Sequence, residues 1–272
     1  MISNLTLVAQ SYNLNIKPVT IEYKKIDKIS LKLHIYKPED FNHNKIYKCI
    51  IFFHGGGWKT GSYKAFERQC SYLASRGMIA ISADYRIKNS HNSTPFDALE
   101  DAKSAIRFVR KNAKQLNINP EMIASGGGSA GGHLAAVCGN IEGLEGAKED
   151  LSVSSKPNAL VLFNPVYDNS KNGYGYENFK ERYIEISPLH NITYGAPPTI
   201  VFFGTNDKTT PLKSTKDYES KMKAVNSRFD LFLYEGQEHS FFNKGLYFYE
   251  TLYQTDVFLA SLGYLNGQPT IK

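Results

Sequence analysis

Two kinds of apolar pattern divide the chain. Near its start, "VTIEYKK" and "LKLHIYKP" alternate apolar with polar residues, which predicts two short strands in an antiparallel edge pair with one solvated face. Later runs are apolar at every position, as strands buried on both faces must be. These predicted buried strands are Cys49–Phe53, Ile79–Ala83, Met122–Ser125, Ala159–Phe163, Thr199–Phe203 and Asp230–Tyr234.

Helical periodicity fills the intervals between the predicted buried strands. It is clearest from Pro95 to Leu116, where apolar residues recur at spacings of three and four. Further helices are expected to begin near Ala130 and Pro211. Strands that alternate with helices predict right-handed crossovers, and therefore a mainly parallel central sheet with an antiparallel N-terminal edge and helices on both faces.

The 272 residues fit a single α/β domain, residues 1–272. One irregular insertion, at about 164–190, is rich in Tyr, Gly and Asn and leaves the sheet after one strand before it rejoins at the next. We expect this insertion to form a small cap or wall beside the sheet.

Composition excludes a disordered protein and a membrane-spanning protein. Apolar residues make up 42% of the chain and charged residues 21%, which is ordinary for a soluble globular protein, and the apolar runs are too short to span a membrane. The net charge of +6 is spread along the chain. Its densest part, Lys103 to Lys114 on one face of the predicted helix, is expected to be a solvated outer face rather than a surface for nucleic acid.

The cysteines and the N-terminus bear on the cellular compartment. Cys49, Cys70 and Cys138 are odd in number and lack metal-ligand or redox spacing, so we expect buried free thiols. The start "MISNLTLVAQS" has no basic n-region and is not a complete secretory signal. A cytoplasmic location is favoured, whereas a periplasmic or secreted one requires a true start upstream.

The stretch "IASGGGSAGGHLAA", Ile123 to Ala136, fits two incompatible templates. In G-x-G-x-x-G, the residues Gly126, Gly128 and Gly131 would cradle the phosphates of a dinucleotide. In G-x-S-x-G, the turn presents Ser129 as a nucleophile.

The position of this turn separates the two templates. A dinucleotide fingerprint normally lies in the first βα turn, with an acidic residue at the end of the next strand. Here at least two buried strands precede the turn, and the acidic residues that follow it (Glu142, Glu145, Glu149) lie in a polar stretch. The position of the turn therefore disfavours dinucleotide binding. A dinucleotide-binding protein is kept as the alternative from a different class.

A nucleophilic serine needs a base and an orienting carboxylate. His239 follows the last predicted strand and Asp207 follows the strand Thr199–Phe203, so both lie at the edge of the sheet that carries Ser129. Two other carboxylates are weaker candidates for this role: Asp217, which is expected in a helix, and Glu238, which is adjacent to the histidine. His133 lies on the same helix as Ser129 and is expected to make structural hydrogen bonds.

A second glycine-rich stretch, "FFHGGGW", directly follows a buried strand. Three glycines allow the backbone to pass close to a ligand and to aim N–H groups at it. Such donors are what a developing oxyanion needs.

The chain order Ser129, Asp207, His239 resembles that of the α/β-hydrolases. Together with H-G-G-G and G-x-S-A-G-G, it resembles the hormone-sensitive-lipase-like and small acetylesterase branch, which includes carbohydrate acetylesterase-like enzymes. The resemblance implies backbone oxyanion donors at Gly56, Gly57 and Ala130. "DYR", D-x-x-x-P and G-x-x-H also match, whereas Thr210 and Ser240 depart, because an apolar residue and a glycine are common there.

The resemblance implies a serine carboxylesterase that needs no cofactor and no metal. The relatives carry a sizeable cap, whereas only about 17 residues precede the first strand here, which favours an open site and short acyl esters, such as those of acetylated saccharides. Candidate substrate contacts are Trp58, Tyr167, Tyr174 and Tyr176, each of which has packing as its alternative role.

Two alternatives on the same fold stay open. Kynurenine formamidases resemble the chain through H-G-G-x-W, matched by His54 to Trp58, which would make the substrate an arylformamide. A catalytically silent binding module is disfavoured because every catalytic position is filled. The oligomeric state is not predicted.

Overall fold

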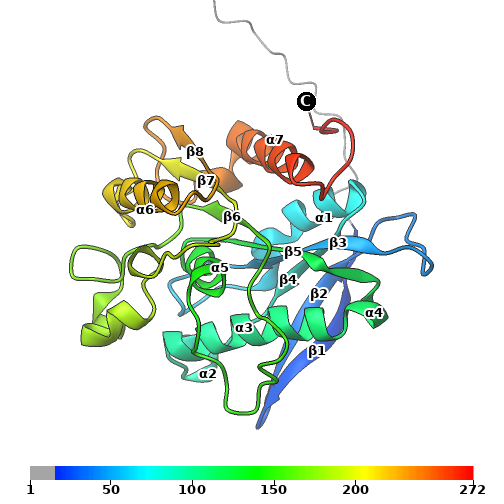
Figure 1. Ribbon diagram of the computed structural model, residues 1–272, viewed down its shortest axis with the longest axis horizontal. Helices are drawn as coiled ribbons and strands as arrows, with labels where there is room; N and C mark the ends of the chain where they lie inside the picture. The colour runs from blue at the N-terminus through cyan, green and yellow to red at the C-terminus, as the bar shows by residue number, and fades with distance from the viewer. Residues whose placement is uncertain (1–15, 272) are drawn as a thin grey trace, which may run out of the picture.

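An eight-stranded sheet runs through the computed structural model, which describes residues 16–271 (Figure 1). Its order is β1-β2-β4-β3-β5-β6-β7-β8, with β2 antiparallel to both β1 and β4 and all other neighbours parallel. The predicted sheet and its antiparallel N-terminal edge are confirmed. The strands are β1 Val19–Ile26, β2 Ile29–Tyr36, β3 Tyr47–Phe53, β4 Ile79–Ala83, β5 Ile118–Gly128, β6 Ala159–Phe163, β7 Thr199–Gly204 and β8 Phe229–Tyr234.

Helices follow most of the strands. The α-helices are α1 Glu67–Ser75, α2 Lys88–His91, α3 Pro95–Lys111, α4 Ala113–Leu116, α5 Ala130–Asn140, α6 Leu212–Ala224 and α7 Gly245–Ser261. The 3-10 helices are η1 Tyr63–Phe66, η2 Tyr176–Asn178, η3 Lys180–Glu185, η4 Pro188–His190 and η5 Phe241–Asn243. The single helix predicted from Pro95 to Leu116 is interrupted at Asn112, whose side chain donates to the Phe108 carbonyl at 2.8 Å. Asn favours such local bonds over helix continuation.

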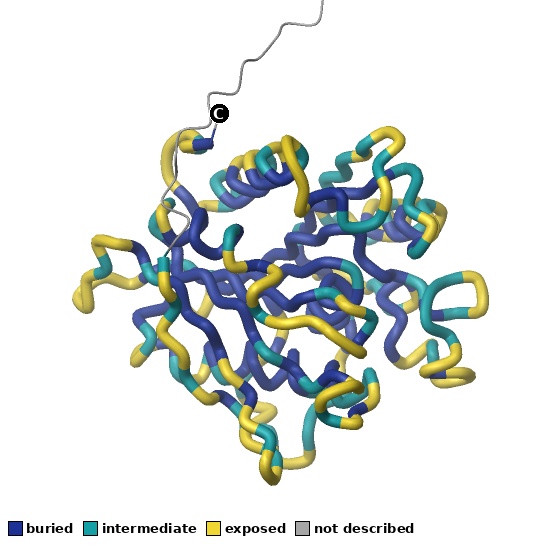
Figure 2. Tube along the Cα trace, turned by 180° about the vertical axis from the view of Figure 1, so that it is seen from behind, coloured by how far each residue is buried: buried dark blue, intermediate teal, exposed yellow. Residues whose placement is uncertain are grey.

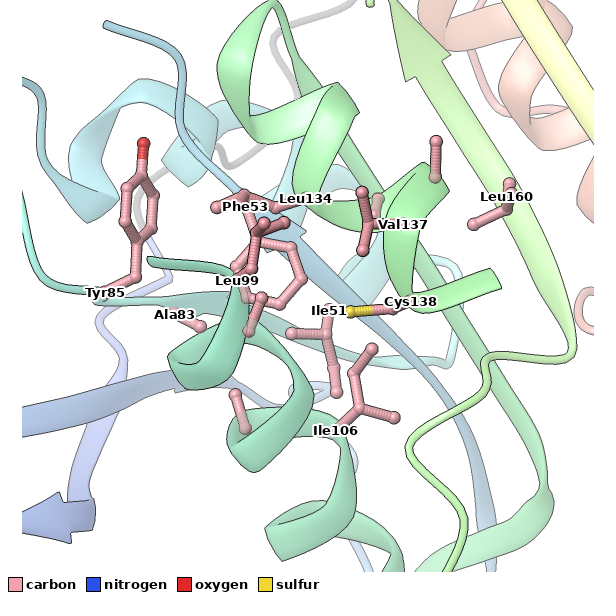
Figure 3. Close-up of a cluster of buried hydrophobic side chains, with 14 of the residues drawn as sticks. Ile51, Phe53, Ala83, Tyr85, Leu99, Ile106, Leu134, Val137, Cys138 and Leu160 are labelled. Carbon is pink, nitrogen blue, oxygen red and sulfur yellow. The ribbon is translucent and has the colours of Figure 1, made fainter. Parts of the chain in front are cut away.

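The sheet has a hydrophobic core on each face because successive strand residues point to opposite sides. Ile51 of β3 packs with Leu99 of α3 and Leu134 of α5 (Figure 3). Its neighbour Ile50 packs in the other cluster, with side chains of α1 and α7. Full burial of each such side chain stabilises the fold by about 1.5–3 kcal/mol.

The last strand, β8, differs from its prediction. It lies at the end of the sheet order, and its residues are half-buried or exposed, whereas the inner strands are buried (Figure 2). The expectation of burial on both faces is wrong here, because the sequence of β8 does not reveal that β7 is its only neighbour.

The basic face from Lys103 to Lys114 is solvated only in part: Lys111 and Lys114 are exposed as predicted, but the start of this face is covered. Lys103 and Arg107 are buried, and both pair with Glu145, at 2.9 and 3.4 Å. Arg107 also pairs with Glu149 at 3.4 Å. The segment 141–158, which follows α5, covers this face and supplies both carboxylates, so the positive charges are neutralised locally.

The membrane and compartment predictions rest on different parts of the chain. Within residues 16–271, no helix has the length and apolarity that spanning a bilayer requires. The segment Met1–Ser11, on which the cytoplasmic expectation rests, lies outside the described residues.

Gly131 shows how closely α5 packs on β3. A Cβ added there would lie 2.0 Å from the Phe53 carbonyl oxygen, a backbone atom that has no room to move. We expect Gly131→Ala to lower the free energy of unfolding by about 3 kcal/mol or to prevent folding, measured by urea denaturation.

Gly139→Ala on the same helix is the matched control. Its added Cβ would lie 3.0 Å from Leu160 Cδ1, the end of a side chain, and alanine gains about 1 kcal/mol of helix propensity. The free energy of unfolding should therefore change by less than about 1 kcal/mol. Equal losses in both variants would contradict the close-approach argument.

Candidate active site

Ser129 lies on a strained turn between β5 and α5. Its φ of 53° and ψ of −120° belong to a region that residues with a side chain rarely adopt, at a cost of about 1–3 kcal/mol. Its N–H donates to the Phe163 carbonyl at 2.9 Å. A Cβ at Gly127 would lie 2.5 Å from the Phe53 oxygen, so the turn requires glycine beside the serine.

Protein packing also accounts for the glycines of the competing G-x-G-x-x-G template. A Cβ at Gly126 would lie 2.5 Å from the Val161 carbonyl oxygen, and one at Gly128 would lie 2.7 Å from the Phe242 ring. The pattern is thus explained by the tight turn itself, without a phosphate group.

The structure brings the three predicted catalytic side chains together. His239 Nε2 lies 2.9 Å from Ser129 Oγ, and His239 Nδ1 lies 2.7 Å from Asp207 Oδ2. Because an ionised carboxylate only accepts, Nδ1 carries the proton and Nε2 is free to accept from the serine hydroxyl. Asp207 follows β7 and His239 follows β8, so two neighbouring strands deliver the acid and the base.

Five donors surround the Asp207 carboxylate. Oδ1 accepts from the backbone N–H groups of Thr209 and Thr210, at 2.8 and 3.0 Å. Oδ2 accepts from Asn164 Nδ2 at 2.7 Å and Thr210 Oγ1 at 2.9 Å, besides His239. Burial raises the pKa of Asp207, but the hydrogen bonds from His239 and these backbone groups outweigh it, so the pKa lies below its usual range.

Sequence reasoning missed Asn164 and the hydroxyl of Thr210 as partners of Asp207. Asn164 was assigned only as the start of the insertion, yet it directly follows β6, beside the strand that precedes Asp207. Its position at the carboxyl end of a buried strand was the available signal. Asp217, the weaker candidate, lies within α6 and pairs with Lys213 at 2.6 Å.

The predicted oxyanion donors lie on either side of Ser129. Gly56 and Gly57 have φ values of 117° and 61°, and a Cβ at Gly56 would lie 2.1 Å from the Thr60 carbonyl oxygen. Among the described residues, the N–H groups of both glycines make no hydrogen bond. Ala130 is the first residue of α5, where N–H groups have no partner within the helix.

Buried aromatic residues hold the glycine loop. Tyr85 Oη donates to the His54 carbonyl at 2.8 Å, and the two rings stack with centroids 4.3 Å apart. Burial lowers the pKa of His54, so its ring is neutral, and Nδ1–H donates to the Gly55 carbonyl at 2.7 Å. His54 of H-G-G-G therefore shapes the loop rather than the reaction.

A cleft of about 470 Å³ opens at Ser129 and His239. Tyr174 lines it, as predicted, and its hydroxyl lies close to Gly57. The other lining residues are Gly55, Gly56, Gly57, Lys59, Thr60, Ala65, Phe66, Gly128, Thr209, Ser240, Phe242 and Asn243.

Three other aromatic residues proposed as substrate contacts lie elsewhere. Trp58 is buried, with its ring edge-on to His133 and Phe179, and Tyr167 is buried and stacked on Tyr218. Tyr176 donates to Glu181 and does not line the cleft. The structure therefore assigns Trp58 and Tyr167 to packing, and it places Tyr176 half-buried outside the cleft. Irregular segments do not reveal from sequence which rings face the core.

His133 has the structural role expected for it. Its Nε2 lies 2.9 Å from the Ile186 carbonyl oxygen and 3.0 Å from Asn169 Oδ1, so this nitrogen donates. Burial lowers the pKa of His133 to about 4, and the ring is neutral. It ties α5 to the insertion, residues 164–190.

Sequence and structure comparisons relate the chain to esterases and hydrolases. Residues 33–171 match the BD-FAE family and residues 169–265 the Dienelactone hydrolase family. The apo form of Thermogutta terrifontis esterase 2 is 42% identical over 93% of this chain and 97% of that chain, with a TM-score of 0.89. Esterase LipC of Mycobacterium tuberculosis is 29% identical over 65% of this chain and 48% of its own length. Acetylxylan esterase of Xylanibacter ruminicola is 26% identical over 71% and 41%.

An α/β-hydrolase of the serine esterase type is the class that the sheet and these relatives define. Because one match covers about half of the chain and an esterase structure is 42% identical over nearly all of it, the chain belongs to the BD-FAE family within that class. The resemblance inferred from the motifs is confirmed. The chain spans about half the length of the curated relatives that it matches first.

The bond from Tyr85 to the glycine loop yields a prediction. Tyr85→Phe leaves the buried His54 carbonyl without this donor, which should lower the free energy of unfolding by about 1–3 kcal/mol. Because Gly56 and Gly57 lose their support, kcat for an aryl acetate should fall about tenfold with little change in KM.

Tyr36→Phe is the matched control for this substitution. Tyr36 is equally buried, and its hydroxyl has no hydrogen-bond partner among the described residues. Its loss should leave both stability and kcat nearly unchanged. If Tyr36→Phe and Tyr85→Phe behave alike, the loop does not depend on the Tyr85 hydroxyl.

Proposed function

We propose that the protein hydrolyses carboxylic esters of short acyl groups through an acyl-enzyme on Ser129. The observation that carries the proposal is the hydrogen-bonded chain from Ser129 through His239 to Asp207 at a cleft. A hydroxyl in contact with an oriented, unprotonated imidazole nitrogen is the arrangement that activates a serine.

The proposed reaction has two halves. Ser129 Oγ attacks the ester carbonyl carbon while His239 Nε2 takes the serine proton, and the imidazole then returns that proton to the departing alcohol. Water attacks the acyl-enzyme in the same way and releases the acid and the free serine. Asp207 stabilises the transient imidazolium, and its lowered pKa keeps it ionised.

The oxygen of the tetrahedral intermediate needs donors that are already in place. We assign this role to the N–H groups of Gly56, Gly57 and Ala130. Each such donor contributes about 2.7–4 kcal/mol of barrier lowering. The lack of competing hydrogen bonds at Gly56 and Gly57 supports the assignment.

The acyl side of the cleft supports a short chain. The Phe242 ring packs against Gly128, the residue before Ser129, and the Phe66 ring lies close to the same glycine. The two rings stack with centroids 6.2 Å apart and are almost fully buried, so they close the cleft near the nucleophile. Solved structures of the Thermogutta terrifontis esterase are described as propionate bound and butyrate bound.

For the alcohol we propose a bulky group, such as an acetylated saccharide. Tyr174 alone among the predicted tyrosines lines the cleft, and its ring is available to stack on a sugar face. An acetylxylan esterase is among the relatives. An arylformamide remains the second candidate, because Gly55, Gly56 and Gly57 of the H-G-G-x-W stretch that suggested it line the same cleft.

The nucleophile assignment predicts the behaviour of one variant. Ser129→Ala should lower kcat for p-nitrophenyl acetate by about 10⁴-fold or more while the folded structure, followed by circular dichroism, is retained. Paraoxon should inactivate the wild type and add one phosphoryl group to the peptide that carries Ser129, measured by mass spectrometry. A structure of the Thermogutta relative is described as phosphorylated by paraoxon.

Two outcomes would overturn this assignment. Turnover of the acetate by Ser129→Ala would show that another group is the nucleophile, and so would a label on a different peptide. Acetylated xylan, acetylated monosaccharides and N-formylkynurenine, assayed beside the aryl ester, decide between the ester and the formamide.

The acyl-length limit can be tested at Phe242. The wild type should hydrolyse p-nitrophenyl acetate at least about tenfold faster than the octanoate. Phe242→Ala should raise the octanoate-to-acetate ratio of kcat/KM about tenfold. A pocket discriminates between substrates that differ by one methylene group by about 1–3 kcal/mol, so removal of the ring should relieve at least that much. Phe248→Ala is the control, since Phe248 is buried in the same core cluster but does not line the cleft. An unchanged ratio in Phe242→Ala places the acyl limit elsewhere.

A further inference from the structure

The oxygen of Asp207 that faces His239 is shared. Oδ2 accepts from His239 Nδ1, from Asn164 Nδ2 and from Thr210 Oγ1, all within 2.9 Å. Thr210 is one of the two departures from the family pattern, in which an apolar residue commonly precedes Pro211. An apolar side chain there leaves only two donors on this oxygen.

We propose that the hydroxyl of Thr210 is a positioning group that weakens the hold of Asp207 on the protonated imidazole and so extends activity to lower pH. The inference rests on the proposed function, since it concerns the same hydrogen-bonded chain. It assigns to one side chain a role that the backbone of the same residue does not fill.

Geometry separates the hydroxyl of Thr210 from its backbone. The backbone N–H groups of Thr209 and Thr210 bind Oδ1, and any non-proline residue supplies them. Among the donors of Thr209 and Thr210, only the Thr210 hydroxyl reaches Oδ2, the oxygen that accepts from His239. Thr210 is 1% exposed and does not line the cleft, so it acts through Asp207 and not on the substrate.

The direction of the effect follows from electrostatics. A hydroxyl that donates to Oδ2 points the positive end of its dipole at the same oxygen as the imidazole N–H does. It therefore partly neutralises the negative charge of Oδ2 that stabilises the imidazolium. Without the hydroxyl, Oδ2 stabilises the protonated imidazole more strongly. His239 then stays protonated to higher pH, and since only the neutral ring accepts the serine proton, the acid limb of the rate profile moves upward.

Other charged or titratable groups near His239 are unaffected by the substitution. They lie along the cleft and in the neighbouring depression that His239 also lines, and within the described residues none of them bonds to its ring. These groups are Lys59, Tyr174, Glu238, Lys244, Tyr247 and Glu250. A shift on changing Thr210 therefore reports on Asp207 and its donors.

The test compares two substitutions of Thr210. Thr210→Val keeps the shape and removes the donor, whereas Thr210→Ser keeps a donor. In Thr210→Val the acid limb of kcat/KM for p-nitrophenyl acetate should move up by about half a pH unit, with KM unchanged and the plateau within about threefold of the wild type. Thr210→Ser should retain the profile of the wild type.

Thr215→Val is the matched control. Thr215 is fully buried on α6, and its hydroxyl has no hydrogen-bond partner among residues 16–271. The same change of side chain should leave the acid limb in place. If Thr210→Val does not fold, Thr210→Ala removes the same donor with a smaller side chain and is measured instead.

A readout without substrate separates this inference from the proposed function. The NMR signal of the Nδ1 proton between His239 and Asp207, titrated in the resting protein, should shift its midpoint upward in Thr210→Val even if no ester is turned over. Absence of ester turnover in the wild type would refute the proposed function alone. A midpoint that stays in place or moves down, whatever happens to stability, would refute the role of the Thr210 hydroxyl.

Discussion

The contact between the β5–α5 turn and the end of β3 sets the geometry of the site. Added Cβ atoms at Gly127 and Gly131 would lie 2.5 and 2.0 Å from the same Phe53 carbonyl oxygen, so two backbone segments meet with no side chain between them. Phe53 is the last residue of β3, and the glycine loop begins directly after it. Ser129 and the glycine loop, the proposed nucleophile and the proposed oxyanion donors, are therefore held at a fixed separation by backbone atoms, which move far less than side chains.

Much of this arrangement was predictable because it depends on strand ends. Buried strands are continuously apolar, and the loops after parallel strands meet at one edge of a sheet, so Ser129, Asp207 and His239 follow from their positions in the sequence. The glycine-rich turn was predictable for a related reason. Tight backbone contacts admit no Cβ, and only glycine satisfies that constraint.

What sequence did not predict depends on which segments cover which faces. Lys103 and Arg107 have the pattern of a solvated helix face, yet a loop some 40 residues later in the chain supplies Glu145 to both, at 2.9 and 3.4 Å. Trp58 and Tyr167 were placed at the site because of their neighbours in sequence, but their rings pack inward. Long-range cover of this kind has no local periodicity, so no local pattern reports it.

The polar groups of the site differ in how many hydrogen bonds they make, and this difference matches what ester hydrolysis requires of each group. Within residues 16–271, the N–H groups of Gly56 and Gly57 have no acceptor, while the Asp207 carboxylate has five donors. Negative charge develops on the substrate oxygen during ester hydrolysis, so donors there must be vacant beforehand. In the proposed reaction the charge of Asp207 does not move, and a fully bonded carboxylate stays ionised and fixed while the proton passes between Ser129 and His239. Each added donor also reduces the charge offered to the imidazole, which makes the number of donors on Oδ2 a means of setting the pH range of the enzyme.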